Sequence, residues 1–302
     1  MRKVDMHVHS KYSPTPSEWF LRQIGMNECY TEIEQVYQMA KANGMEYVTI
    51  TDHNTVDGII ELNKRHPEDT FTGVEITTGF PEDGCKMHVL LYDMTKEQYD
   101  VIEQIRKNIY HVRDYIIKHN IPHSVAHATY AVNNRLSMDV WEKLILMFDV
   151  FEGINGCRNP YFNYSWMEGL QNLTPKTINR LYRKHGIEPM SSDPWVKGFT
   201  GGSDDHAGLF IGKTYTDTEA RTKEEFLQNL RDKKTMARGR NNDYKGSAFV
   251  FYKIIQDHRD TQDDKGKNKL FSLINKIVFQ SKGLSFKENY GIHRLKIGGK
   301  KK

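Results

Sequence analysis

The sequence predicts an α/β protein whose strands form a parallel sheet closed into a barrel. Short β-branched segments alternate with longer segments in which apolar residues recur at every third or fourth position, and this alternation favours a parallel sheet covered by helices. About seven strand–helix units follow one another without an obvious break, which favours a barrel over an open sheet. The 302 residues are enough for one large core, so we expect one main domain.

The first predicted units lie in the N-terminal fifth of the chain. We expect strands at residues 4–8 and 47–51, where short runs rich in apolar and β-branched residues occur. Between them, Thr31 and Glu34 have the spacing of a capping box, which predicts a helix that starts there. Gly44 is typical of the residue that follows a helix, so the helix should end at that point.

The later units continue the same alternation, and no internal repeat interrupts them. The predicted strands are 71–76, 87–92, 124–127, 149–152 and 187–190. The predicted helices are a long amphipathic one from 102 to 116, one at 138–147, one from Thr174-Pro175 to Gly186 and one that begins at the capping box Thr222–Glu225.

Composition is that of an ordinary globular protein, with 38% hydrophobic and 27% charged residues. No apolar run approaches 18 residues and the N-terminus lacks a signal-peptide pattern, so we expect a cytoplasmic protein without a membrane span. The three cysteines, Cys29, Cys85 and Cys157, are widely spaced and form no C-x-x-C motif. We expect free thiols rather than disulfides or a cysteine-rich zinc site.

The net charge of +4 is unevenly distributed. Residues 257–302 contain 12 Lys and Arg against 5 Asp and Glu, which leaves the rest of the chain mildly acidic. We therefore divide the chain into a domain at 1–257 and a basic, partly flexible extension at 258–302, with one apolar stretch at 270–279 that we expect to be a docked helix. Such an extension can contact nucleic acid or an anionic membrane, although a solvated terminus is the interpretation we favour.

Unusual polar residues gather at the ends of the predicted strands. They are His7, His9, Asp52, His53, Glu75, His88, His127, Asp204 and His206. In a parallel barrel the carboxyl ends of all strands open on one face, so we expect these side chains to converge. Residues two apart on a strand point to the same side, which lets His7 and His9 hold one ion together. Imidazoles and carboxylates without thiolates suit Zn²⁺, Mn²⁺ or Fe²⁺.

The same residues carry a resemblance to a known family. HVHSKYS, TDHNTVDG, GVEIT, the lone histidine of KMHVLLY, AHA and GSDDH occur in this order over about residues 1–220. In that order and context they resemble the PHP (polymerase and histidinol phosphatase) superfamily, and in particular its stand-alone bacterial phosphoesterase-like proteins. The resemblance implies a distorted barrel of seven β/α units with two or three divalent metal ions.

The resemblance also implies a ligand for each ion. A first ion would be held by His7, His9 and Asp204, and Glu75 would bridge it to a second ion. The second ion would be held by His88 and His127, and a third by His53 and His206 with an acidic residue soon after HSKYS. This chain has Pro14 where that acidic residue is expected. We therefore expect a stable pair of ions and a labile third, unless water, Asp52 or Asp205 replaces the missing ligand.

The chemistry expected of such a cluster is hydrolysis of a phosphoester. Metal ions a few ångströms apart lower the pKa of a bound water and clamp the oxygens of a displacement at phosphorus. Arg158 is the candidate that would bind the phosphate through its guanidinium fork, and Lys213 is a second. His206 or a metal-bound water would protonate the leaving group, and Asp52 and Asp205 would orient the ligating imidazoles.

The substrate would be a small phosphorylated metabolite, a nucleotide or the end of an oligonucleotide. Tyr161, Phe162, Tyr164 and Trp166 would wall a base-binding pocket, but packing in the core or in a lid is the interpretation we favour. AGLFIGKT resembles a phosphate-binding P-loop but has Ala207 in place of the first glycine and precedes a strand-like segment, so we expect no ATP site there.

Two other functional classes remain open from the sequence. One is a non-catalytic regulatory module that binds metal or nucleic acid. The other is a metal-dependent amidohydrolase, which is disfavoured because that class uses a bridging lysine where this chain has Glu75. Substrate, choice between mono- and diesters, metal identity and oligomeric state are not predicted.

Overall fold

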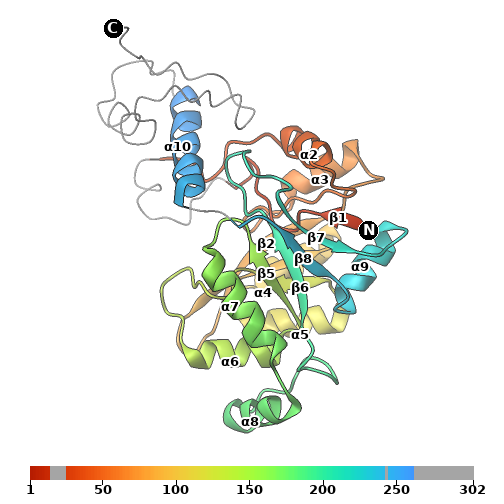
Figure 1. Ribbon diagram of the computed structural model, residues 1–302, viewed down its shortest axis with the longest axis vertical. Helices are drawn as coiled ribbons and strands as arrows, with labels where there is room; N and C mark the ends of the chain where they lie inside the picture. Colours follow the sequence, from red (N-terminus) through yellow and green to blue (C-terminus); the bar gives the residue numbers. More distant parts are fainter. Residues whose placement is uncertain (14–24, 242–243, 262–302) are drawn as a thin grey trace.

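The computed structural model describes residues 1–13, 25–241 and 244–261 (Figure 1). Within them, helices surround two β-sheets. One sheet contains, in spatial order, β2 (Gly73–Gly79), β3 (Lys86–Tyr92), β4 (His123–Val125), β5 (Val150–Asn155) and β6 (Gly198–Gly202). The other contains β1 (Arg2–Val4), β7 (Thr214–Thr218) and β8 (Met236–Gly239). The predicted α/β class is confirmed.

The larger sheet is mixed, so the prediction of an all-parallel sheet is wrong. β4, β5 and β6 run parallel, but β3 is antiparallel to both β2 and β4. Residues 80–85 alone connect β2 to β3, and the Phe80 amide donates to the Cys85 carbonyl across this turn at 2.9 Å. A parallel connection needs a crossover of a dozen or more residues, so this short turn permits only a hairpin.

The predicted strand at 4–8 does not continue beyond Val4, and the predicted strand at 47–51 is not formed. β1 ends at Val4, and beyond it Val8 and Val48 make only single β-bridges, to Asp205 and Thr70. The Asp5 side chain gives a physical reason, because it accepts the backbone N–H groups of residues 203 and 212 at 2.8 Å each. Side chains that bond backbone groups in this way compete with ladder pairing.

Backbone hydrogen bonds nevertheless keep these segments beside the larger sheet. The Met6 amide donates to the Gly201 carbonyl at 3.3 Å, and the Thr51 amide donates to the Val8 carbonyl at 2.9 Å. Residues 6–9 therefore lie between the end of β6 and residues 48–53. Closure of all these segments into one seven-unit barrel stays a prediction.

The helices cover the sheets, and most predicted ones are present. They are α2 (Ile33–Ala42), α3 (Asp57–Arg65), α4 (Lys96–Ile105), α5 (Ile109–His119), α6 (Met138–Met147), α7 (Pro160–Gln171), α8 (Pro175–His185), α9 (Lys223–Arg231) and α10 (Tyr244–Thr261). Thr174 and Thr222 cap α8 and α9 as predicted, and Gly186 ends α8 in the left-handed conformation. α3, α7, α10, β6 and β8 were not among the predicted elements.

Three predicted elements differ in the structure. The long helix predicted from 102 to 116 is two helices, because the Asn108 side chain accepts the Tyr110 amide and starts α5. α2 starts after Glu32 without a side-chain cap, so the capping box at Thr31 is wrong. Residues 187–190 are not a strand, and there the Met190 amide donates to the Leu146 carbonyl at the end of α6.

The main core lies between the larger sheet and the helices around it. Ile50, Ile76, Leu144 and Phe151 are among its fully buried members. The three cysteines are free thiols, as predicted. None of the helices in the described parts of the chain is both long enough and apolar enough to cross a lipid bilayer.

α10 and α8 lie at opposite ends of the long axis of the molecule (Figure 1). α10 continues through residue 257 to Thr261, so the basic segment begins inside a helix. The rest of that segment, including the predicted helix at 270–279, lies outside the described residues, as does Pro14.

Candidate metal centre

Glu75 lies at the centre of a buried cluster of imidazoles. It occupies the third position of β2 and is completely buried. Its Oε2 atom lies 3.2 Å from His7 Nε2, 3.3 Å from His9 Nε2 and 3.0 Å from His53 Nδ1, and its Oε1 atom lies 2.6 Å from His88 Nδ1 and 3.2 Å from His127 Nε2. One carboxylate is thus shared by five histidines from distant parts of the sequence.

Asp204 is the second carboxylate of the cluster. Its Oδ1 atom lies 3.4 Å from Nε2 of both His7 and His9, and 3.7 Å from His206 Nδ1. All eight predicted metal ligands therefore lie within one connected cluster. Their convergence agrees with the prediction from strand ends, although the sheet that carries Glu75 and His88 is antiparallel there.

Backbone contacts bring the first and last ligand motifs together. The Asp204 amide donates to the His7 carbonyl at 2.6 Å, and the His9 amide donates to the Asp205 carbonyl at 3.1 Å. Gly202 allows this approach, because a Cβ atom at that position would lie 2.2 Å from the Cβ of His7. A side chain at residue 202 is thus incompatible with the observed position of His7.

Two of the ligands have an unusual backbone conformation. His127 has φ of 27° and Asp204 has φ of 51°, in the region that favours glycine. The His127 amide donates to Glu152 Oε2 at 2.8 Å, which holds this residue in place. Strain of this kind is typical of functional sites, where surrounding contacts maintain it.

Glu152 is a site residue that sequence reasoning missed. Its Oε1 atom lies 2.9 Å from His7 Nδ1, and its Oε2 atom also accepts the side-chain amide of Asn155 at 2.8 Å. The same Asn155 amide donates to Asp204 Oδ2 at 3.1 Å. Glu152 thus orients the His7 ring through its Nδ1 atom. Its signal in the sequence is a lone carboxylate within the apolar strand VFEGIN.

Asp52 is connected to the cluster by hydrogen bonds from two serines. Its carboxylate accepts the Ser10 amide and hydroxyl at 2.7 Å each and the Ser13 hydroxyl at 2.9 Å. Ser13 Oγ in turn lies 3.2 Å from His9 Nδ1. Asp52 is therefore linked to His9 only indirectly, through Ser13.

Asp205 does not face the cluster. Its carboxylate accepts the backbone N–H groups of residues 207–210 and so fixes the loop after His206. The hydrogen bonds of Asp52 and Asp205 thus join them to serines and to backbone N–H groups rather than to His53 or His206.

Glu28, which was not predicted, lies beside His53 and His206. Its Oε2 atom lies 3.2 Å from His53 Nε2, and its Oε1 atom lies 3.7 Å from His206 Nε2. It belongs to no recognised motif, and MNEC contains no signal that distinguishes it from a surface glutamate. Only the fold places Glu28 beside these imidazoles.

The carboxylates of the cluster are strongly acidic. Burial alone raises the pKa of Glu75, but the charges of His88, His7 and His53 outweigh burial and hold that pKa well below its ordinary value. The pKa of Asp204 is likewise held well below its ordinary value against burial, chiefly by His7. The pKa of Glu28 falls to about 2 despite burial, because of His53 and His206.

The imidazoles divide into two groups. Burial lowers the pKa of His7, but Asp204, Glu75 and Glu152 outweigh it and raise that pKa well above its ordinary value. The pKa of His53 is raised in the same way by Glu75 and Glu28.

In the second group burial dominates. It lowers the pKa of His88 to about 4 and also lowers the pKa of His206. Nearby carboxylates thus favour the protonated form of His7 and His53, whereas burial favours the neutral form of His88 and His206.

The donor set fits divalent metal ions. Within this cluster four groups of three donor atoms lie within 4.8 Å of one another, and they are His7–His9–Glu75, His7–His127–Asp204, His53–Glu75–His88 and His9–His53–His206. The buried Nε2 atom of His206 has no hydrogen-bond partner among the described residues. Several close imidazole and carboxylate atoms that lack hydrogen-bond partners are better satisfied by shared cations, and this chemistry suits Zn²⁺, Mn²⁺ or Fe²⁺.

Arg158 lies near the cluster, whereas Lys213 does not. The Arg158 guanidinium lies 4.1 Å from the ring centre of Tyr130, and that ring lies 5.7 Å from the ring of His127. Arg158 Nε is buried and has no hydrogen-bond partner among the described residues. Lys213 Nζ donates to Asn43 at the end of α2, so the structure does not bring it to the cluster.

The aromatic residues after Arg158 divide between surface and core. Tyr161, Phe162 and Tyr164 are at least half exposed on α7, at 71%, 52% and 50%, so they do not pack in the core, and packing in a lid stays a prediction for them. Trp166 is buried, as predicted. The side chain of Asn163 anchors this helix by donating to the Asn155 carbonyl at 2.9 Å.

Sequence comparisons match only part of the chain. No protein-family model matches the chain. Over 77 residues the chain is 38% identical to an uncharacterized protein of Methanocaldococcus jannaschii, and this match covers 26% of the chain and 42% of that relative. The match thus spans less than half of the relative's length.

Among solved structures, a two-domain protein of Bacteroides vulgatus that contains a predicted PHP-like metal-dependent phosphoesterase has a similar fold. The TM-score is 0.50 at 14% identity, over 83% of this chain and 69% of that one. PsfC of Pseudomonas syringae aligns with a TM-score of 0.48 at 14% identity, over 85% and 98%. The resemblance predicted from the six motifs is confirmed at the level of the fold.

Proposed function

We propose that this chain, which has a PHP-type fold, is a metal-dependent hydrolase of phosphoesters. The observation that supports the proposal most is the convergence of six imidazoles on the two buried carboxylates of Glu75 and Asp204. Two or three divalent ions held there would activate water and neutralise charge on a phosphate.

The ligands of these ions would be the eight predicted residues. Glu75 would bridge, because each of its two oxygens faces a different set of imidazoles. Glu152 would hold His7 in the tautomer that leaves Nε2 free for coordination, since its carboxylate lies against Nδ1. Asp52 would do the same for His9 through Ser13.

Arg158 would bind the phosphate. Its Nε atom is buried without a partner among the described residues, and a guanidinium in that state is well suited to an anion that arrives with two acceptor oxygens. The stacking of Arg158 on Tyr130 fixes the plane of the guanidinium beside His127. Lys213 is poorly placed for this role, because it is bonded to Asn43.

His206 would act as a neutral ligand rather than as the acid that protonates the leaving group. Burial lowers its pKa, which disfavours the protonated imidazolium that would act as the acid. Its two nitrogens also face Asp204 and Glu28. A water molecule would then be the source of the proton.

Turnover of model substrates tests the proposal. Protein loaded with Mn²⁺ is expected to hydrolyse p-nitrophenyl phosphate or its bis ester, and His7→Ala is expected to abolish the reaction. His111→Ala, at an exposed position on α5, is the matched control and should keep full activity. Hydrolysis of dihydroorotate but of no phosphoester would instead favour an amidohydrolase. Stoichiometric metal without any turnover on a broad panel would favour a non-catalytic module.

The substrate class beyond the phosphoester stays open. A phosphorylated metabolite, a nucleotide and an oligonucleotide end all fit a site with one guanidinium. The basic segment from residue 258 would add affinity for nucleic acid, and salt-sensitive binding of single-stranded DNA that is lost on truncation would support that role.

A further inference from the structure

Glu28 lies outside the motifs, yet its carboxylate faces two ligating imidazoles. Its oxygens lie 3.2 Å from His53 Nε2 and 3.7 Å from His206 Nε2. These two imidazoles and that of His9 also form a compact group whose nitrogen atoms lie within 4.8 Å of one another. Glu28 thus adds a carboxylate beside this group of imidazoles.

The three imidazoles lie close enough together to share one ligand. The rings of His9 and His206 are stacked with centroids 4.0 Å apart, and those of His9 and His53 are 4.6 Å apart. His206 Nε2 is buried without a hydrogen-bond partner among the described residues, although it points toward Glu28. A buried nitrogen that lacks a partner is costly, and a cation between His206 and Glu28 would satisfy both.

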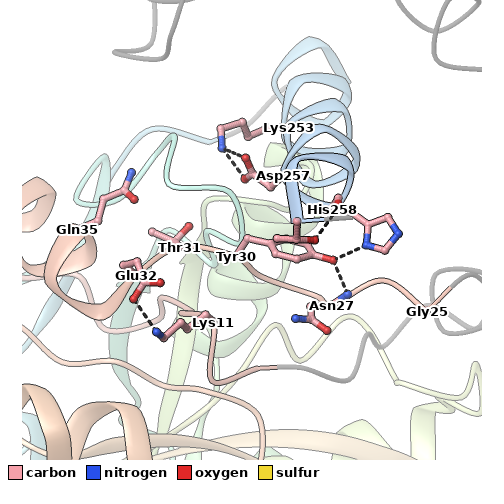
Figure 2. Close-up of a pocket in the computed structure, with 11 residues that line it drawn as sticks. Lys11, Gly25, Asn27, Tyr30, Thr31, Glu32, Gln35, Lys253, Asp257 and His258 are labelled. Atoms are coloured by element: carbon pink, nitrogen blue, oxygen red, sulfur yellow. Dashed lines mark hydrogen bonds and ion pairs between the residues drawn. The ribbon is translucent and has the colours of Figure 1, made fainter. Parts of the chain in front are cut away.

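The segment that carries Glu28 is held by α10. The Asn27 amide donates to the Tyr30 hydroxyl at 2.9 Å, and the same hydroxyl lies 2.8 Å from Nδ1 of His258 on α10 (Figure 2). A cavity of about 550 Å³ borders this segment, so one side of it lacks close packing. The position of Glu28 therefore depends on contacts with α10.

The same helix also supports the loop that carries His206. Met26, Ala207 and Leu209 pack with Tyr252 and Ile254 of α10 in one apolar cluster. Ala207 directly follows His206, and Met26 lies two residues before Glu28. One helix thus packs on both segments that supply the unusual pair of donors.

We infer that Glu28 is the carboxylate ligand of a third cation site, with His53 and His206 and beside the ring of His9, and that α10 holds it there. Glu28 takes the role that the resemblance would give to an acidic residue at position 14. This inference deepens the proposed function but concerns the binding of the ion alone. Its test therefore measures metal content, and a fully loaded protein without phosphoester turnover would contradict the proposed function and leave the inference intact.

The first experiment counts ions in the full chain. Metal-free protein is titrated with Mn²⁺ and separately with Zn²⁺, and bound metal is measured after equilibrium dialysis. Glu28→Gln is expected to lose one ion per chain, or to bind the last ion at least about tenfold more weakly, while the remaining ions are retained. Wild-type stoichiometry and affinity in Glu28→Gln would overturn the inference.

Matched variants separate ligation from folding. Glu32→Gln makes the same change four residues away, where the side chain pairs with Lys11 at the surface, and should bind metal like the wild type. Glu28→Asp keeps the carboxylate and should recover part of the affinity that Glu28→Gln loses. If Glu28→Asp and Glu28→Gln bind the last ion equally weakly, the carboxylate is not the ligand.

A second pair of variants tests the role of α10. Tyr30→Phe removes the hydroxyl that joins Asn27 to His258 and is expected to weaken only the last ion. Tyr110→Phe removes a hydroxyl bonded to Glu82, away from the cluster, and should have no effect. Unchanged affinity for every ion in Tyr30→Phe would refute the part assigned to α10.

Discussion

Glu75 and His88 are diagonal neighbours on two antiparallel strands, with Glu75 Oε1 2.6 Å from His88 Nδ1. Glu75 pairs directly with Leu90, and His88 lies two residues from Leu90 on the same face. Diagonal positions of this kind are within reach of long side chains. The hairpin that contradicts the predicted parallel sheet is therefore what brings these two ligands together.

Glu75→Gln is expected to remove more bound metal than the loss of any single imidazole. Its carboxylate contacts five histidines, so the amide weakens every ion that it bridges. Metal analysis after dialysis measures this, with Glu82→Gln on the exposed turn as control. Two ions retained at wild-type affinity in Glu75→Gln would argue against a bridging role.

Glu152→Gln is expected to weaken metal binding by about 10- to 100-fold without removing a ligand. The amide cannot provide both the acceptor for His7 Nδ1 and the acceptors for the His127 and Asn155 N–H groups. Competition with a chelator measures the affinity. An unchanged affinity would mean that His7 needs no orientation by Glu152.

Gly202→Ala is expected to destabilise the protein by about 1–3 kcal/mol, as overpacking does, and to displace His7. The added Cβ would lie 2.2 Å from the Cβ of His7 and 2.6 Å from its amide nitrogen. Thermal unfolding of the metal-free protein measures the cost.

Gly169→Ala on α7 is the matched control for Gly202→Ala. It has open space around the added Cβ and should stabilise the helix by about 0.5–1 kcal/mol. Equal unfolding temperatures for the two variants would contradict the steric argument.

Metal affinity is expected to rise with pH through the raised pKa values of His7 and His53. Both pKa values lie well above the ordinary value because nearby carboxylates outweigh burial, so both imidazoles are protonated without metal. Coordination needs the neutral form, and each bound ion must therefore displace protons.

Calorimetric titration in buffers of different ionisation enthalpy counts the protons released on metal binding. We expect release at neutral pH, and less release once the pH exceeds these raised values. Proton uptake, or affinity that is flat from pH 6 to 9, would contradict the assigned charges.

Arg158→Lys is expected to lower kcat/KM for a phosphoester by about 10- to 100-fold with unchanged metal content. Lysine keeps the charge but lacks the planar fork and its second hydrogen bond to phosphate. Steady-state kinetics and metal analysis of the same preparation measure the two effects. Arg135→Lys, at an exposed position beside the β2–β3 turn, should behave as the wild type.

The eight proposed metal ligands could be selected from the sequence because each lies in a short motif next to an apolar segment. His7 and His9 illustrate this, since a two-residue spacing at a strand end sets their common direction before any tertiary contact forms. Helices α6 and α8 were equally predictable, because their apolar spacing and caps are local features. These predictions needed only neighbouring residues.

Glu28 and Glu152 became site residues only through tertiary structure. A carboxylate 19 residues after His9 has no local property that marks it, and it reaches His53 because α10 packs on its segment. The antiparallel β3 and the short β1 were likewise decided by a six-residue turn and by the bonds of Asp5 to loops 200 residues away. Local propensity determines which segments can be strands or helices and which side chains can bind metal. Long-range hydrogen bonds and packing decide which of those side chains meet.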